Sequence, residues 1–394
     1  MVPRTFWLKS LESAWARGSI VWLAGARGVG KTSLCQSIPD LEYFHCGLPD
    51  TRHRIEDPEE FLGKLKGKKI VLDEIHRLPN PLEILKIAAD RFPSLKVIAT
   101  GLTSLQSSSV SRDPLGEKIT QVWLTPMMSR DLVDFGNPDL AHRFLRGGLP
   151  SFFLKPKRPE DFQEWLDSFW VKDIQKPFRL ESRNSLQRFM ELLFRQSGEL
   201  FEASRFASPC EVSRPTITKY LSALEATRAV QVLRPFSTQR SVEIISIPKV
   251  YAFDTGFFCY YRGWQQLRED DFRVLWKYWV LNELVSHVQA PVIHYWRDKR
   301  GHEVDFVLIR REMGIMAITS RWRAQEFSPR DLRAFRYHYP GGLNWIVCDD
   351  VKKGYTHSFG KLKVEFMSLE EMGRRLSAAK PQPKETKTYF QPLA

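Results

Sequence analysis

A glycine-rich segment near the beginning of the chain has the residue types and spacing that bind phosphate. The segment runs Gly25, Ala26, Arg27, Gly28, Val29, Gly30, Lys31, Thr32 and Ser33. Glycines at these positions let backbone N–H groups close around phosphate oxygens, and a helix that begins at the lysine adds its partial positive charge. We expect Lys31 to reach the β- and γ-phosphates and the Thr32 hydroxyl to bind Mg²⁺. The segment therefore predicts a loop that binds ATP and Mg²⁺.

Two adjacent acids follow an apolar run further along the chain. The run Ile70–Leu72 ends in Asp73 and Glu74. Asp73 is expected to hold hydrated magnesium together with Thr32, and Glu74 is expected to polarise the water that attacks the γ-phosphate. Thr100 ends the next apolar run and is a candidate sensor of the γ-phosphate, with an ordinary strand-end threonine as the alternative. Asp73, Glu74 and Thr100 are the predicted catalytic residues.

Short strands and helices must bring these segments together. The apolar runs 19–24, 69–72 and 96–100 predict buried strands, and the segment 81–93 has the apolar spacing of a helix. Strands that alternate with helices are typical of an α/β domain with a parallel sheet. The segment 144–150, with two glycines and a proline, is expected to be a hinge or a domain edge.

The middle of the chain, from 151 to about 250, has a mainly helical pattern. Ser213 can cap a helix whose second residue is Pro215 and whose apolar side chains are Ile217, Leu221 and Leu224. An earlier helix and a later β-forming segment complete the pattern of a helix-turn-helix with a wing. The candidate DNA contacts are Ser213, Arg214, Thr216, Thr218, Lys219 and Arg240, with Arg234 and Lys249 as further wing or backbone contacts. A protein-binding module or a lid is the alternative interpretation.

Composition favours a polyanionic partner such as DNA. The 394 residues include 59 basic and 46 acidic side chains, which gives a formal net charge of +13. Five cysteines are scattered without metal-ligand spacing, so we expect reduced, buried thiols. The first residues lack the apolar segment of a signal peptide, and no apolar run reaches the length of a membrane span. We expect a cytoplasmic protein without membrane contact.

Several motifs occur in an order that resembles a known family. They are GARGVGKTSL, VLDEIHRLPNPLEILKIAADRFP, RGGLPSFF, PKVYAFDTGF, VLNEL and YWRDKRGHEVDFVL. The chain resembles the bacterial and archaeal AAA-type (P-loop) ATPases that carry a C-terminal DUF4143 region. The resemblance implies an α/β fold with an AAA-like domain at 1–150, a winged-helix domain at 151–250 and a PD-(D/E)xK nuclease-like domain at 251–370. A disordered tail is expected at 371–394, and assembly into a homo-oligomer is expected by analogy.

The nuclease-like site departs from the pattern that the resemblance implies. Glu283 and Asp305 correspond to the first two metal-binding acids of those nucleases, but Thr319 and Arg321 stand where the pattern has Glu-x-Lys. A threonine supplies no carboxylate, and arginine lacks the geometry and the adjustable pKa of lysine. We therefore predict a degenerate site that does not cut DNA.

A second departure lies in the ATPase part. Residues 115–118 are Leu-Gly-Glu-Lys where similar proteins carry a Gly-Arg pair that stabilises charge on the phosphates. Arg112, Lys118 or an arginine of a neighbouring subunit are the candidates to replace it. Without such a cation, cleavage of the γ-phosphate is expected to be slow.

Taken together, the residues predict an ATP-binding and ATP-hydrolysing protein whose nucleotide state controls DNA binding. The winged helix and the inactive nuclease-like domain would make the DNA contacts. Two alternatives remain: a signalling or scaffold ATPase whose C-terminal domains bind protein, and an ATP-gated DNA nuclease.

Overall fold

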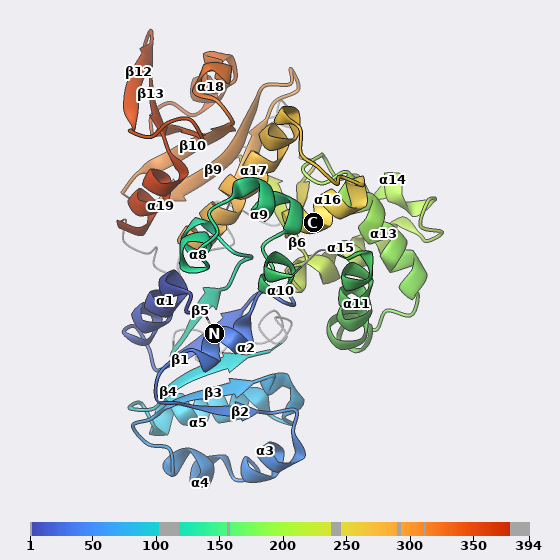
Figure 1. The fold of residues 1–394 in the computed structure, drawn as a ribbon, viewed down its shortest axis with the longest axis vertical. Helices are drawn as coiled ribbons and strands as arrows, with labels where there is room; N and C mark the ends of the chain where they lie inside the picture. Colours follow the sequence, from blue (N-terminus) through green and yellow to red (C-terminus); the bar gives the residue numbers. More distant parts are fainter. Residues whose placement is uncertain are drawn as a thin grey trace. The chain divides into compact units, whose positions relative to one another are not determined.

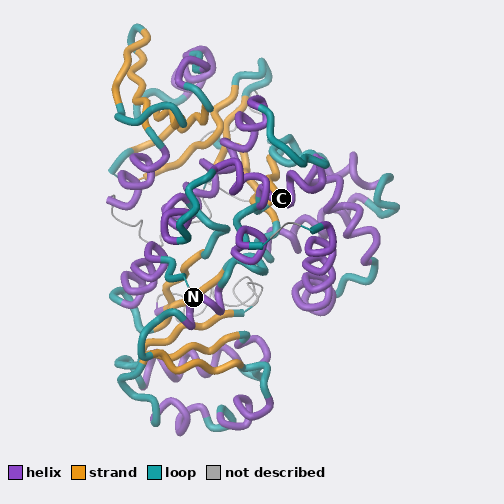
Figure 2. The backbone as a smooth tube through the Cα atoms, viewed as in Figure 1, coloured by secondary structure: helices purple, strands orange, loops and turns teal. Residues whose placement is uncertain are grey.

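The computed structural model describes residues 2–101, 118–155, 158–237, 246–289, 293–310 and 312–378 (Figure 2). The chain divides into two compact units. One consists of residues 1–187 and 216–229, and the other of residues 188–215 and 230–394. The predicted domain boundaries at 150, 250 and 370 fall at different positions, and the division into three domains stays a prediction.

The first unit is built on a five-stranded sheet in which all neighbouring strands are parallel. Its strand order is β2-β3-β4-β1-β5. The strands are β1 (Ile20–Ala24), β2 (Leu41–His45), β3 (Lys69–Asp73), β4 (Lys96–Thr100) and β5 (Ile119–Trp123). The three predicted strands are confirmed to within one residue at each end. Because all strands run the same way, the segments that follow β1, β3 and β4 leave from one edge of the sheet.

Helices before and between these strands cover the sheet. They are α1 (Thr5–Trp15), α2 (Lys31–Gln36), α3 (Pro49–Arg54), α4 (Pro58–Gly63), η1 (Ile75–Arg77) and α5 (Pro81–Arg91). In Figure 1, α3, α4 and α5 lie on the same side of the sheet. Alternate side chains of β1, Ile20, Trp22 and Ala24, pack in one core with Phe61 of α4 and Leu85 of α5. This alternation follows from the period of two in a strand.

A series of helices follows β5. They are α8 (Ser129–Asp134), α9 (Leu140–Arg146), α10 (Pro150–Leu154), α11 (Pro159–Phe169), the π-helical turn η2 (Trp170–Ile174), α12 (Gln175–Phe178), α13 (Arg183–Arg195), α14 (Ala203–Ala207) and α15 (Arg214–Ala226). Helix α15 confirms the predicted amphipathic helix, since Pro215 is its second residue and Ile217, Leu221 and Leu224 are buried. Proline is favoured at such a position because the first turn needs no N–H partner.

The second unit contains an eight-stranded mixed sheet. Its strand order is β12-β13-β11-β10-β9-β8-β6-β7. The strands are β6 (Val230–Pro235), β7 (Lys249–Ala252), β8 (His294–Arg297), β9 (Glu303–Arg310), β10 (Gly314–Arg321), β11 (Asn344–Cys348), β12 (Tyr355–Phe359) and β13 (Leu362–Met367). β12 forms one edge of the sheet, and the lysines beside it, Lys352, Lys353, Lys361 and Lys363, are exposed.

The helices of the second unit are α16 (Thr255–Arg262), α17 (Glu269–Val288), η3 (Ala324–Glu326), α18 (Pro329–His338) and α19 (Leu369–Ala378). Helix α19 corrects the predicted tail, because residues 371–378 are helical and the α19 side chains Met372 and Leu376 are buried. The rest of the predicted tail, 379–394, lies outside the described residues.

Two expectations from composition can be compared with the structure. All five cysteines are free and buried, as predicted. Among the described residues, none of the helices has both the length and the apolar character needed to cross a membrane.

Candidate nucleotide-binding site

The predicted phosphate loop connects β1 to α2 at the carboxyl edge of the parallel sheet. Gly28 and Gly30 have φ values of 83° and 94°, which glycine adopts without steric cost. A Cβ atom at Gly25 would overlap the carbonyl oxygen of Leu124. The glycines are therefore required by the path of the backbone, and the turn that they form leads into the first residue of α2, Lys31.

Lys31 lies across the loop that precedes it. Its Nζ donates hydrogen bonds to the carbonyl oxygens of Gly25 at 2.8 Å and Ala26 at 3.2 Å. Burial lowers the pKa of Lys31, and the negative charges of Asp173 and Glu74 partly oppose this effect. The ammonium group is thus held at the loop by neutral acceptors, which a phosphate could replace with a charged acceptor.

Asp73 is the centre of a hydrogen-bond network at the end of β3. Thr32 donates to its Oδ2 at 2.9 Å, and the hydroxyls of Tyr43 and Thr100 also donate to this carboxylate. Burial acts to raise the pKa of Asp73, but the hydrogen bonds from Thr100, Tyr43 and Thr32 outweigh burial and lower it. Asp73 is therefore ionised near neutral pH, and the structure brings the predicted metal residues Thr32 and Asp73 together.

Glu74 has an unusual backbone conformation at the same edge. Its φ of 58° and ψ of 41° are left-handed, which costs a residue with a Cβ about 1–2 kcal/mol. The backbone N–H of Glu74 donates to the Thr100 hydroxyl at 3.1 Å. Its carboxylate is 35% exposed and lies 3.4 Å from Nε2 of His76. Glu74 is thus the more accessible of the two acids, as the attack of a water molecule requires.

Thr100 is fully buried, with an exposed fraction of 0%. Its hydroxyl contacts the Asp73 carboxylate and the Glu74 backbone. In this structure Thr100 positions the two acids, and direct contact with a γ-phosphate stays a prediction.

The chemistry of the donors fits a magnesium ion. The Thr32 hydroxyl and the Asp73 carboxylate are oxygen ligands, which Mg²⁺ prefers. Within the described ranges, no three His, Cys, Asp or Glu side chains are grouped as a metal site. An ion held here would accordingly complete its shell with phosphate and water, which is how Mg²⁺ commonly binds beside nucleotides.

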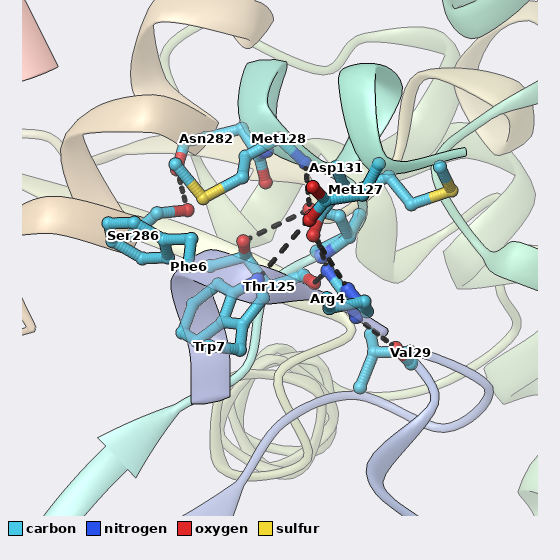
Figure 3. Close-up of polar contacts among 12 residues, drawn as sticks. Arg4, Phe6, Trp7, Val29, Thr125, Met127, Met128, Asp131, Asn282 and Ser286 are labelled. Carbon is cyan, nitrogen blue, oxygen red and sulfur yellow. Dashed lines mark hydrogen bonds and ion pairs between the residues drawn. The ribbon is translucent and has the colours of Figure 1, made fainter. Parts of the chain in front are cut away.

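An arginine near the beginning of the chain is hydrogen-bonded to the phosphate loop (Figure 3). Arg4 donates to the carbonyl oxygen of Val29 at 2.8 Å and forms two hydrogen bonds with Asp131, at 2.9 and 2.6 Å. Asp131 also accepts from the indole of Trp7 at 3.3 Å and from the backbone N–H of Met128 at 2.9 Å. Arg4 and Asp131 are buried, so this ion pair is shielded from water.

The helices that follow β5 also pack against the loop. The Trp165 indole donates to the carbonyl oxygen of Arg27 at 3.1 Å, and the Arg27 side chain pairs with Asp173 of η2. A Cβ at Gly28 would lie 3.3 Å from Leu149. The segment 144–150 therefore lies within the first unit, where Leu149 packs against the phosphate loop. The boundary between the two compact units does not fall within residues 144–150.

Most of the candidate DNA contacts lie on or beside α15. Ser213, Arg214, Thr218 and Lys219 are exposed, and Thr216 is half-buried. Lys219 donates to the carbonyl oxygen of Arg179 at 3.4 Å.

The predicted wing contacts have three different outcomes. Arg234 is exposed at the end of β6. Lys249 is buried and paired with Glu303 at 2.5 Å, so its prediction as a DNA contact is wrong for this conformation. Arg240 lies outside the described residues.

Asp305, one of the predicted nuclease-like residues, is paired with two cationic side chains. Asp305 of β9 pairs with Lys277 of α17 at 2.6 Å and with Arg321 of β10 at 3.2 Å. The Ser320 backbone N–H donates to the same carboxylate at 2.9 Å. Burial acts to raise the pKa of Asp305, but the charges of Lys277 and Arg321 outweigh it and hold the pKa well below its usual range. Two cations beside this carboxylate leave a poor site for a metal ion.

The other two residues of that site are also buried. The Glu283 carboxylate lies 3.4 Å from Nε2 of His287, one turn further along α17. Thr319 is buried in β10 and supplies a hydroxyl, not a carboxylate. Sequence reasoning missed Lys277, which precedes Glu283 by six residues in α17 and belongs to no motif.

Three parts of the chain match family models. Residues 17–133 match an AAA domain. Residues 137–268 match a domain of unknown function (DUF8612), and residues 274–360 match another (DUF4143). The matches support an AAA-type ATPase domain followed by a C-terminal DUF4143 region.

Two curated proteins and two solved structures are among those similar to this chain. Uncharacterized proteins of Mycobacterium tuberculosis and Mycobacterium bovis are each 27% identical to this chain over 310 residues, which is 75% of this chain and 68% of the relative. The RuvB Holliday junction branch migration motor of Thermotoga maritima is 19% identical, with 59% of this chain and 87% of that chain covered and a TM-score of 0.25. A signal transduction ATPase with a tetratricopeptide repeat sensor from Pyrococcus horikoshii is 13% identical, with 71% and 46% covered and a TM-score of 0.24. These TM-scores are too low to support a functional argument.

The AAA domain contains the phosphate loop and both acids, but not every residue that holds them. Arg4 precedes the matched segment, and Asp173 follows it. Of the cations considered as replacements for the missing Gly-Arg arginine, Lys118 pairs with Asp90 at 2.6 Å. Arg112 lies outside the described residues, as do residues 115–117.

Proposed function

We propose that this protein binds and hydrolyses ATP with Mg²⁺, and that its nucleotide state controls DNA contact through the exposed face of α15. The observation that carries the proposal is the 2.9 Å hydrogen bond between Thr32 and Asp73. This bond brings the phosphate loop and the acidic end of β3 to one point, as hydrolysis of a nucleoside triphosphate requires.

The residues divide the work of hydrolysis. Lys31 and the loop N–H groups bind the phosphates, and Glu74 accepts a proton from the attacking water. The water oxygen forms a bond to the γ-phosphorus while the bond to the bridging oxygen breaks, and ADP leaves with that electron pair. Bound Mg²⁺, held by Thr32 and Asp73, would neutralise charge on the phosphates. Thr100 keeps Asp73 and Glu74 in position through its buried hydroxyl.

The DNA part of the proposal rests on order along the chain and on contacts within the first unit. Helices α13, α14 and α15 are followed by the antiparallel pair β6 and β7, which is the order of a winged helix. Arg228, just after α15, lies 3.5 Å from the ring centroid of Trp123 at the end of β5. A cation–π contact of this kind connects α15 to the ATPase sheet. The net charge of +13 favours DNA over neutral partners.

The nuclease-like part is proposed to be inactive. The Asp305 carboxylate is paired with Lys277 and Arg321, so it would bind a metal ion only after both cations moved away. This pairing favours a role in DNA or protein contact over an ATP-gated nuclease.

The test of the ATPase is equilibrium binding of a fluorescent ATP analogue and steady-state hydrolysis, each with and without duplex DNA. Lys31→Ala should lose binding because the phosphates lose their side-chain cation. Glu74→Gln should keep binding and lose turnover by roughly 100-fold, a typical loss for an acid–base residue. If Glu74→Gln hydrolysed ATP as fast as the natural protein, this assignment of the catalytic acid would be wrong.

The test of DNA contact is the salt dependence of duplex affinity with and without ATP. Affinity should fall steeply with salt if phosphates are bound. Arg214→Glu with Lys219→Glu should weaken binding. Lys64→Glu, which reverses an exposed charge at the end of α4, is the control. Equal affinity in all variants, without a salt effect, would favour the alternative of a scaffold ATPase that binds protein.

A further inference from the structure

An ion pair joins the phosphate loop to the π-helical turn η2. The guanidinium Nε of Arg27 pairs with Oδ2 of Asp173, and the two side chains are 21% and 19% exposed. The Trp165 indole, four residues before the end of α11, donates to the backbone carbonyl of Arg27. The third residue of the loop is thus held through its side chain and its backbone by one helical segment.

The charges around this pair are those that a nucleotide would meet. Asp173 attracts both Arg27 and Lys31 and is repelled by Glu74, while burial raises its pKa. Arg27 in turn acts on Lys31, because its positive charge contributes to the lowered pKa of that lysine. Arg27 is therefore paired with Asp173, and the charges of Lys31 and Glu74 act on the same carboxylate without a direct contact.

A triphosphate brought to Lys31 changes this balance. Its negative charges repel the Asp173 carboxylate and attract the Arg27 guanidinium, whose planar fork suits phosphate oxygens. Arg27 can exchange one carboxylate for phosphate without leaving the loop, because its backbone is fixed by Trp165.

We propose that Arg27 contacts the terminal phosphates of bound ATP as a second cation beside Lys31, and that Asp173 is the positioning residue that holds Arg27 before ATP binds. The inference rests on the proposed ATPase function. Residues 115–118 contain no arginine, and their lysine, Lys118, is paired with Asp90. Arg27 is therefore a further candidate for the cation that acts on the phosphates. Arg27 would stabilise the charge that develops as the γ-phosphate departs.

The inference is tested with full-length Arg27→Ala, Arg27→Lys, Asp173→Asn and the double variant Arg27→Ala with Asp173→Asn. Each is measured by equilibrium binding of a fluorescent ATP analogue and by single-turnover hydrolysis at saturating ATP. Asp173→Asn should tighten binding by roughly threefold to tenfold, because an anion near Lys31 is removed. Arg27→Ala should weaken binding, because Asp173 is left unpaired beside the phosphates.

The double variant separates a catalytic from a structural role. Binding should recover from the Arg27→Ala level towards the natural level, because the unpaired carboxylate is gone, while hydrolysis at saturation stays roughly 100-fold slow. Arg27→Lys should restore part of the rate. The matched control is the exposed ion pair of Arg91 and Glu59 in the same unit, where Arg91→Ala and Glu59→Gln should change neither measurement.

Three outcomes would overturn this inference alone. Recovery of the hydrolysis rate together with binding in the double variant would make Arg27 only a structural residue. Weaker binding in the nearly isosteric Asp173→Asn variant would contradict competition between Asp173 and phosphate. Variants that match the natural protein in both measurements would also refute it, while the proposed ATPase would stand. Failure of the natural protein to bind the analogue would instead refute both proposals.

Discussion

Asp131→Asn should strongly destabilise the unit that contains the phosphate loop. The Asp131 carboxylate accepts two hydrogen bonds from Arg4 and one each from Trp7 and Met128. The substitution leaves the buried Arg4 guanidinium without its counter-charge. Breaking a buried pair in this way costs about 3–5 kcal/mol. Each 1.4 kcal/mol changes an equilibrium constant tenfold, so the ratio of folded to unfolded protein should decrease by a factor of about 100 to 4,000.

The assay is urea unfolding of the full chain with and without ATP. The two units can unfold separately, so the relevant transition is the one that ATP shifts, by about 2.7 kcal/mol when ATP is present at 100 times its Kd. Glu60→Gln is the control, because it removes an exposed pair with Lys64 that should contribute less than about 1 kcal/mol.

A double-mutant cycle tests the cause of the loss. Arg4→Met and Asp131→Asn together should cost less than the sum of the single changes, because each single variant leaves a buried charge unpaired and the double variant leaves none. Additive losses would refute the interpretation of Arg4 and Asp131 as one energetic unit. An Asp131→Asn protein with the natural unfolding midpoint would refute the importance of the pair altogether.

Three further predictions concern the loop, the acids and the second unit. Gly25→Ala should abolish binding of the ATP analogue, because its Cβ would overlap the carbonyl oxygen of Leu124; a natural Kd would contradict this. Thr100→Val should lower the free energy of unfolding by about 1–3 kcal/mol and slow hydrolysis, because the buried Asp73 carboxylate loses a donor. Asp305→Asn should destabilise the second unit at neutral pH, since the folded pKa of Asp305 lies below its ordinary value of 3.8. That contribution is complete above about pH 5 and is lost as the pH falls through the folded pKa, so urea unfolding should show the natural and variant proteins converging in acid.

The sequence was sufficient for the central strands of the first unit and insufficient for its edges. Strands β1, β3 and β4 are almost entirely buried, so each has an uninterrupted apolar run. Strands β2 and β5 form the two edges, and their half-buried positions carry polar residues such as Glu42 and Gln121. Such mixed runs have no clear period, and neither strand was predicted.

The candidate site shows a similar division. Lys31, Thr32 and Asp73 belong to short motifs whose chemistry is visible in the local sequence, and the structure brings the three side chains near one another. Arg4 and Asp131 are 127 residues apart, and Asp173 belongs to no motif. Their roles depend on the tertiary path of the chain, which a single sequence does not encode in any local pattern.

The exposed edge of the second sheet has a consequence for self-recognition. An outermost strand can template pairing with a strand of another chain, which is the first step of edge-to-edge aggregation. Here a second copy approaching β12 would bring its own lysines against Lys352, Lys353, Lys361 and Lys363. Like-charge repulsion at this edge opposes the growth of a continuous intermolecular sheet. Salt limits such repulsion to a range of about 10 Å at 0.1 M and to shorter distances at higher salt. The protection should therefore weaken as the ionic strength rises.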